Sequence, residues 1–156
     1  MSKLKSHTST YLDFSEECIS TIELPNFNIF KLEKEVGSEN TLSTVSCYVF
    51  ISLGLYSIIE YNSFEKFLQE ITKGYSRKNS YHTDLHAADI EQTCFLYLKY
   101  GKIAEVAKLT NLDITALLIS AIIHDFKHPG FTNNFMINTK SELSILYNGK
   151  LCFLNY

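Results

Sequence analysis

The feature that most constrains the fold is an apolar run that ends at a histidine and an aspartate. From residue 114 to residue 123, apolar side chains recur at the i, i+3, i+4 and i+7 positions of a helix, and most other positions are also apolar. A helix that is apolar on all sides is normally packed by neighbours on most of its faces. The run therefore predicts a central helix that begins near Asp113 and presents His124 and Asp125 at its carboxyl end.

The composition favours other helices around this one. The 156 residues include only six glycines and two prolines, and 46% of them are apolar, which argues against turn-rich sandwiches and against disorder. Spacing and capping residues predict further helices at about 41–54, from Ser63 onward, at about 81–100 and within 141–147. We expect one all-α domain of six or so helices, preceded by a polar lead-in at residues 1–23.

Charge and cysteine spacing exclude several functions. Fourteen basic and 17 acidic residues give a net charge of −3, so we expect no nucleic-acid partner. The start of the chain lacks a secretory pattern, and the cysteines form no CxxC pair, which predicts free thiols and a cytoplasmic location. The cysteines are Cys18, Cys47, Cys94 and Cys152. The uncharged stretch 41–59 has the length of a membrane span, but serines, threonines and flanking acids favour a buried helix.

Four histidines fall into two groups that suggest metal chemistry. His82, His86 and Asp89 stand at i, i+4 and i+7, so on a helix they share one face. His124 and Asp125 end the apolar run, where burying an imidazole beside a carboxylate is costly unless a divalent metal neutralises the pair. Two simpler interpretations stay open: an exposed HxxxH without a ligand, and a histidine that only interacts with a helix dipole.

The two groups together resemble a known family. The run Tyr81-His82-x-x-His86-Ala87-Ala88-Asp89, followed by His124-Asp125-x-x-His128-Pro129-Gly130 and Ser141-Glu142-Leu143, is similar to the catalytic domain of class I 3′,5′-cyclic nucleotide phosphodiesterases. The resemblance implies an all-α fold of the HD type, of which this chain holds the N-terminal half only. We expect a partial catalytic domain at residues 24–148.

The resemblance also implies two divalent metal ions. His86, His124 and Asp125 match three ligands of a zinc-like ion, and Asp125 also matches the bridge to a second ion, magnesium or manganese. A water molecule activated by the two metals would attack the phosphorus of cyclic AMP or cyclic GMP and give the 5′-monophosphate. The resemblance leaves the choice between the two nucleotides open.

Three further residues match positions around these metals. His82 matches the general acid that protonates the departing 3′ oxygen. His128 matches a position just outside the metal ligands, and Tyr81 would help to wall the substrate pocket. Thr83 stands where the family usually has asparagine, a change that spares every metal ligand.

The resemblance ends at Asn148, and residues 149–156 form a divergent tail. The family's fourth metal ligand and the groups that hold the base are expected outside this chain. We therefore expect an incomplete site, and an exposed apolar surface on the helix at 114–124 that favours association.

Two alternatives to a phosphodiesterase stay open. One is a truncated, non-catalytic interaction protein. The other is a different HD-type metal phosphohydrolase, although the His-Pro-Gly and Ser-Glu-Leu segments favour the cyclic nucleotide family.

Overall fold

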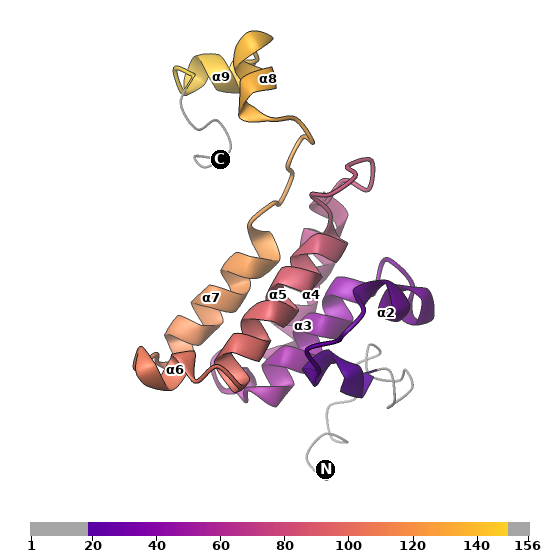
Figure 1. The fold of residues 1–156 in the computed structure, drawn as a ribbon, viewed down its shortest axis with the longest axis vertical. Helices are drawn as coiled ribbons and strands as arrows, with labels where there is room; N and C mark the ends of the chain where they lie inside the picture. The colour runs from indigo at the N-terminus through magenta and orange to yellow at the C-terminus, as the bar shows by residue number, and fades with distance from the viewer. Residues whose placement is uncertain (1–18, 150–156) are drawn as a thin grey trace.

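The computed structural model describes residues 19–149, and this part of the chain contains helices and no strand. The expectation of an all-α fold is confirmed. In chain order (Figure 1), the elements are the 3-10 helix η3 (Thr21–Glu23), α2 (Ile29–Val36), α3 (Thr41–Ser52), the 3-10 helix η4 (Leu55–Ser57), α4 (Tyr61–Gly74), α5 (Asp84–Lys99), α6 (Ile103–Val106), α7 (Asn111–Ile123), α8 (Asn133–Asn138) and α9 (Glu142–Leu146).

Helix α5 is the centre of the bundle, with α3 packed on one side and α7 on the other. Ala87 and Ala88 are fully buried in its first half, where small side chains let neighbouring helices approach closely. The prediction that the run at 114–123 forms the central helix is wrong. Helix α7 buries one face, whereas Leu117 and Ile123 remain 40% and 38% exposed, because no described element covers the other face.

Helix α3 is the buried helix predicted for the uncharged stretch 41–59. It ends at Ser52, and Gly54 then adopts a left-handed conformation (φ +68°) that turns the chain into η4. Among the described residues, no helix is both long enough and apolar enough to cross a membrane.

Three helices begin at residues other than those predicted. Helix α4 begins at Tyr61, because the carboxylate of Glu60, rather than Ser63, accepts hydrogen bonds from the first free N–H groups. Helix α5 begins at Asp84 with Thr83 as its N-cap, so residues 81 and 82 precede the helix. Helix α7 begins at Asn111, behind a capping box between residues 110 and 113.

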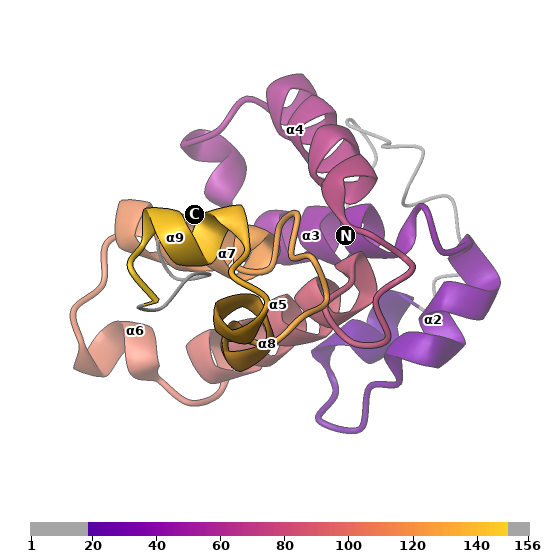
Figure 2. The same ribbon diagram turned by 90° about the horizontal axis from the view of Figure 1, so that it is seen from above.

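Helices α2 and α4 both pack on α3 and close the core around it. The rings of Phe50 in α3 and Phe64 in α4 are stacked, with centroids 4.0 Å apart. Figure 2 shows α4 and α2 at different positions around α3, with α6 at the far side of the molecule from α2. This packing anchors α4, whose carboxyl end reaches the end of α7.

After α7 the chain leaves the bundle. An extended segment leads to α8 and α9, which pack on each other and lie beyond the end of the bundle in Figure 1. Ile145 and Leu146 of α9 are 70% and 72% exposed. The segment between α7 and α8 therefore joins two bodies of helices, and it includes three of the predicted site residues.

Some sequence predictions fall outside the described residues. These are most of the polar lead-in, nearly all of the divergent tail, and the cysteines at positions 18 and 152. Of the others, Cys47 is buried and Cys94 is half-buried, and the two form no disulfide with each other.

Candidate metal centre

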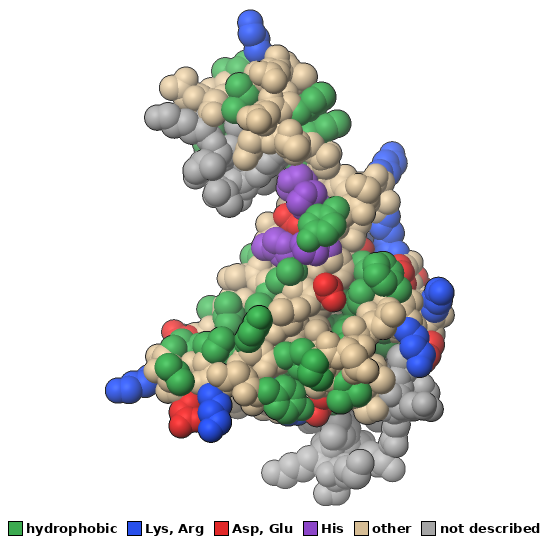
Figure 3. Space-filling view, viewed as in Figure 1, with side chains coloured by type: hydrophobic (Ala, Val, Ile, Leu, Met, Phe, Trp, Pro, Cys, Tyr) green, Lys and Arg blue, Asp and Glu red, His purple; other side chains and the backbone are tan. Residues whose placement is uncertain are grey.

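The predicted site residues meet at the carboxyl end of α7. Three segments bring them together: residues 75–83, here called the approach loop; the first turn of α5, with His86; and residues 124–130, here called the His–Asp turn. In Figure 3 the histidines form one cluster between the bundle and the α8–α9 pair.

His86, His124 and Asp125 form the first group of possible metal ligands. The Nε2 atoms of His124 and His86 lie 3.1 Å and 3.8 Å from Oδ2 of Asp125, and the donor atoms of all three residues lie within 4.8 Å of one another. In a tetrahedral zinc site with bonds of about 2.0 to 2.2 Å, ligand atoms lie about 3.3 to 3.6 Å apart. The group therefore has the chemistry and nearly the spacing of a three-ligand metal site.

The protonation of these ligands also suits a metal. Nδ1 of His124 lies 2.9 Å from the carbonyl oxygen of Ala121, so Nδ1–H donates there and Nε2 is the ring nitrogen that faces Asp125 and could bind a metal ion. Burial and the neighbouring His124 lower the pKa of His86, which keeps this ring neutral. Burial alone would raise the pKa of Asp125, but the hydrogen bond to His82 and the nearby histidines together lower it. Asp125 is therefore anionic at neutral pH, as a carboxylate that binds a metal ion would need to be.

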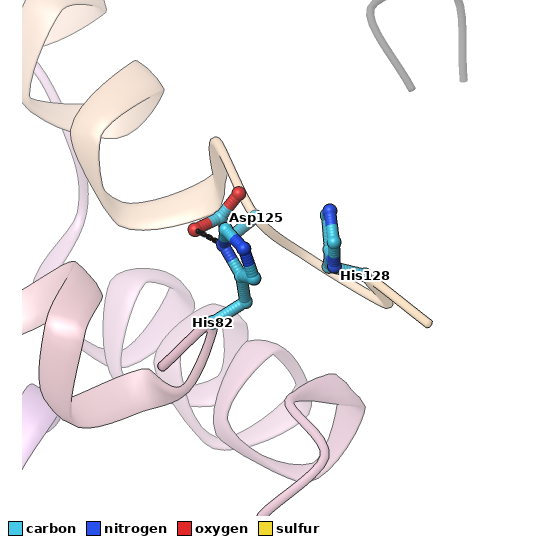
Figure 4. Close-up of side chains that lie close together, drawn as sticks. All are labelled: His82, Asp125 and His128. Atoms are coloured by element: carbon cyan, nitrogen blue, oxygen red, sulfur yellow. Dashed lines mark hydrogen bonds and ion pairs between the residues drawn. The ribbon is translucent and has the colours of Figure 1, made fainter. Parts of the chain in front are cut away.

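His82, Asp125 and His128 form a second group with a different geometry (Figure 4). Nδ1 of His82 lies 2.7 Å from Oδ2 of Asp125, which is a hydrogen-bond distance and leaves no room for an ion between them. The rings of His82 and His128 are stacked, with centroids 3.9 Å apart. Nδ1 of His128 accepts the N–H of Gly130 at 3.0 Å, so its neutral ring carries the proton on Nε2. This group is built for hydrogen bonding rather than for metal ligation.

His82 reaches this position from the approach loop and not from the helix. Because α5 begins at Asp84, the prediction that His82, His86 and Asp89 share one helix face is wrong for His82. Asp89 is exposed and belongs to neither ligand group. Tyr81 is 60% exposed and its ring packs on that of His86, with centroids 4.2 Å apart.

Asp84, the first residue of α5, connects this helix to the approach loop. It is 2% exposed, and its carboxylate accepts a hydrogen bond from the Arg77 guanidinium at 2.6 Å. Burial nevertheless raises the pKa of Asp84, with Arg77 acting in the opposite direction. This pair ties the approach loop to the start of α5, and so helps to place the site.

Two residues at the end of α4, Gly74 and Tyr75, support the His–Asp turn, and neither was predicted from the sequence. The Tyr75 hydroxyl donates a hydrogen bond to the carbonyl of Ile122 at 2.7 Å, in the last turn of α7. A Cβ added at Gly74 would lie 2.0 Å from Cε2 of Phe126. Gly74 is therefore needed for the Phe126 ring to pack against α4, which fixes the direction in which the chain leaves α7.

The His–Asp turn opens onto a cleft of about 770 Å³. Helix α4 lines the cleft with Phe67 and Ile71, and α9 lines it with Leu143 and Leu146. His124, Asp125 and His128 lie on the third wall. The volume is in the range of small-molecule sites, and the lining combines apolar side chains with a few convergent polar groups.

Known proteins of one family are similar to this chain. Residues 81–153 match the family described as 3′5′-cyclic nucleotide phosphodiesterase. The chain is 35% identical over 135 residues to 3′,5′-cyclic-AMP phosphodiesterase 4 of Dictyostelium discoideum, a match that covers 84% of this chain and 12% of that protein. It is 36% identical over 155 residues to the dual specificity calcium/calmodulin-dependent 3′,5′-cyclic nucleotide phosphodiesterase 1B of Mus musculus, covering 94% of this chain and 28% of that protein.

A third relative is the 3′,5′-cyclic-nucleotide phosphodiesterase regA of Dictyostelium discoideum, 36% identical over 142 residues, or 90% of this chain and 17% of that protein. The chain thus spans between 12% and 28% of the length of these relatives. The region that matches the family, residues 81–153, includes both histidine motifs of the site. The chain belongs to the 3′5′-cyclic nucleotide phosphodiesterase family.

Proposed function

We propose that residues 24–148 are part of a catalytic domain that hydrolyses a 3′,5′-cyclic nucleotide, cyclic AMP or cyclic GMP, to its 5′-monophosphate. The observation that carries this proposal is the position of the two histidine groups. One group has the spacing of metal ligands, the other holds a hydrogen-bonded histidine, and both share Asp125 beside a cleft.

Membership of the family implies divalent metal ions. We propose that His86, His124 and Asp125 hold one of them, a zinc ion, and that Asp125 also contacts a second ion, magnesium or manganese. When bound, such ions withdraw charge from phosphate oxygens and lower the pKa of water. Histidine nitrogens suit zinc, and a carboxylate oxygen suits either metal.

His82 is the proposed general acid. Its Nδ1–H is held by Asp125, so the other ring nitrogen, Nε2, is the one that can deliver a proton to the departing 3′ oxygen. The side chain is 36% exposed, which leaves it accessible to a ligand. The hydrogen bond to the Asp125 carboxylate holds the His82 ring in this orientation.

The cleft beside the His–Asp turn is the proposed place of the substrate. Its apolar walls from α4 and α9 suit a nucleobase. His128 lies on the polar wall, and its ring stacks on that of the proposed acid, His82. Tyr81, which covers His86, is proposed to wall the ligand side of that histidine. A cytoplasmic location and the absence of a nucleic-acid partner stay predictions.

The proposal is tested with the chain as given and with a chimera that continues it by the segment that follows the match in the Mus musculus relative. Hydrolysis of cyclic AMP and cyclic GMP is measured with zinc and magnesium present. We expect turnover by the chimera and none by the chain alone. In the chimera, His82→Ala should lower turnover with metal content intact, and Asp125→Ala should lose both.

Other outcomes would overturn the proposal. Metal binding by a folded chimera without hydrolysis would favour the non-catalytic interaction protein. Hydrolysis of a different phosphate ester, with cyclic nucleotides untouched, would favour another HD-type phosphohydrolase. Equal metal loss in both variants would show that His82 is a ligand and not the acid.

A further inference from the structure

Asn79 connects the two loops that build the site. Its side-chain Nδ2 donates hydrogen bonds to two backbone carbonyls, that of His128 at 2.7 Å and that of His82 at 3.2 Å. The first of these bonds joins residues 49 positions apart in the sequence. One amide group thus binds the backbone of both stacked histidines.

The fit of this side chain against the His–Asp turn is close. Gly130 has φ +81°, and a Cβ added there would lie 2.4 Å from Oδ1 of Asn79. The backbone N–H of Asn79 donates to the carbonyl of Ser76 at 3.1 Å, which holds the residue in a turn of the approach loop. Both hydrogens of the amide group and the space beside its oxygen are therefore used by the two loops.

We propose that Asn79 is a positioning residue that keeps His82 and His128 face to face. The inference rests on the proposed function, because that function gives the two histidines their roles. Asn79 acts through backbone atoms, and within residues 19–149 its side chain donates to the backbone of His82 and His128 and not to His86 or His124. Its loss should therefore separate the stacked rings while the proposed metal ligands stay in place.

The chemistry of the side chain makes the assignment specific. A carboxylate of the same shape has no N–H groups, so it would face two carbonyl oxygens without a hydrogen bond. Asn79→Asp is therefore the sharpest variant, and Asn79→Ala is a second one that removes the bonds without adding a charge. Ser80→Ala is the matched control, because Ser80 is the next residue of the same loop and its side chain is exposed.

The experiment is histidine NMR on the 156-residue chain without metal. Stacked imidazoles shift each other's ring protons upfield and give contacts between the rings. For His82 and His128, we expect the upfield shift and the ring-to-ring contacts to be lost in Asn79→Asp and Asn79→Ala. Both should be kept in Ser80→Ala. The signals that link His86 to His124, whose ring centroids lie 5.2 Å apart, should be unchanged in all three variants.

The inference would be overturned if the two rings stayed stacked in either folded Asn79 variant, or if the His86 and His124 signals changed as much as those of His82. The NMR result requires no turnover, so it can succeed even if the proposed function fails. A general acid typically raises the rate of the chemical step by about 10² to 10⁴-fold, and a displaced acid supplies less of this acceleration. In an active chimera, Asn79→Asp should therefore lower kcat about tenfold with KM unchanged. An unchanged kcat there would contradict the positioning role.

Discussion

Helices α3 and α7 are both rich in apolar residues, but they have different surroundings. Nine of the 12 residues of α3 are buried, against four of the 13 residues of α7. Helix α3 is enclosed by α2, α4 and α5, whereas α7 packs mainly on α5. Apolar composition therefore indicated correctly that each helix has a partner, but it predicted wrongly that most faces of α7 are covered.

Small hydroxyl side chains explain how α3 can be enclosed so fully. Thr41 donates a hydrogen bond to the carbonyl of Gly37 at 3.0 Å, and Ser46 donates one to the carboxyl group of Glu91 in α5. These bonds satisfy the hydroxyl groups without water, so neighbouring helices can pack closely. Helix α7 instead carries larger apolar side chains, and Leu112, before its second turn, is 66% exposed.

The largest predicted effect separates the two helices by the same substitution. Leu42→Ala in α3 should lower the free energy of unfolding by about 2 to 5 kcal/mol, because Leu42 is fully buried. Leu117→Ala in α7 should cost less than about 1 kcal/mol, because that side chain is 40% exposed. Leu118→Ala, one residue further and fully buried, is the control and should resemble Leu42→Ala. Urea unfolding measures all three, and equal losses at 117 and 118 would show that α7 is enclosed like α3.

A second prediction concerns pH and the interface between α3 and α5. Burial raises the pKa of Glu91 from 4.5 to about 8, against the opposing effect of the Ser46 hydrogen bond. Because the folded state holds this proton more tightly, the free energy of unfolding should be highest below about pH 4.5 and fall as the pH rises to about 8. Glu91→Gln should remove this fall and be more stable than the wild type at pH 9, by about 1 to 3 kcal/mol.

The matched control for that prediction is Glu105→Gln, since Glu105 is exposed in α6. Unfolding curves between pH 5 and pH 9 make the comparison. A wild type and a Glu91→Gln variant with parallel pH profiles would contradict the burial of an uncharged carboxyl group beside α3.

A third prediction concerns self-association, with only a small expected change in the free energy of unfolding. If the exposed face of α7 favours self-association, Leu112→Lys with Leu117→Lys should lower it, and each substitution should change the free energy of unfolding by less than about 1 kcal/mol. Sedimentation velocity at several concentrations measures the association. Glu105→Lys, which adds an exposed lysine on α6 and not on α7, is the control. Association that is the same in all variants would assign it to another surface, such as α9.

The sequence predicted the helices well where apolar side chains repeat, as in α7 around Leu118. It failed for features that depend on packing between segments. The central place of α5 follows from small residues such as Ala87 that no periodic pattern emphasises. The position of His82 before α5 depends on the cap at Thr83, which spacing alone does not reveal.

The sequence likewise predicted only some of the site residues. His86, His124 and Asp125 stood out because two compact motifs contain them, and these motifs carried the family resemblance. Asn79 and Tyr75 gave no signal, because each makes its contact with a residue 47 or 49 positions away through a backbone carbonyl. Such contacts do not require a particular residue type at the partner position, so a single sequence contains no pattern that marks them.

The proposed metal site predicts that His86, His124 and Asp125 bind one divalent ion. Titration of the 156-residue chain with cobalt(II), followed by its visible absorption, tests this binding, because tetrahedral nitrogen and oxygen ligation differs in spectrum from cysteine ligation. We predict that His124→Ala weakens cobalt binding at least tenfold, because it removes one of the three proposed ligands, and that His82→Ala leaves the affinity unchanged. Equal losses of affinity in the two variants, or full binding by His124→Ala, would show that these three residues do not form the metal site.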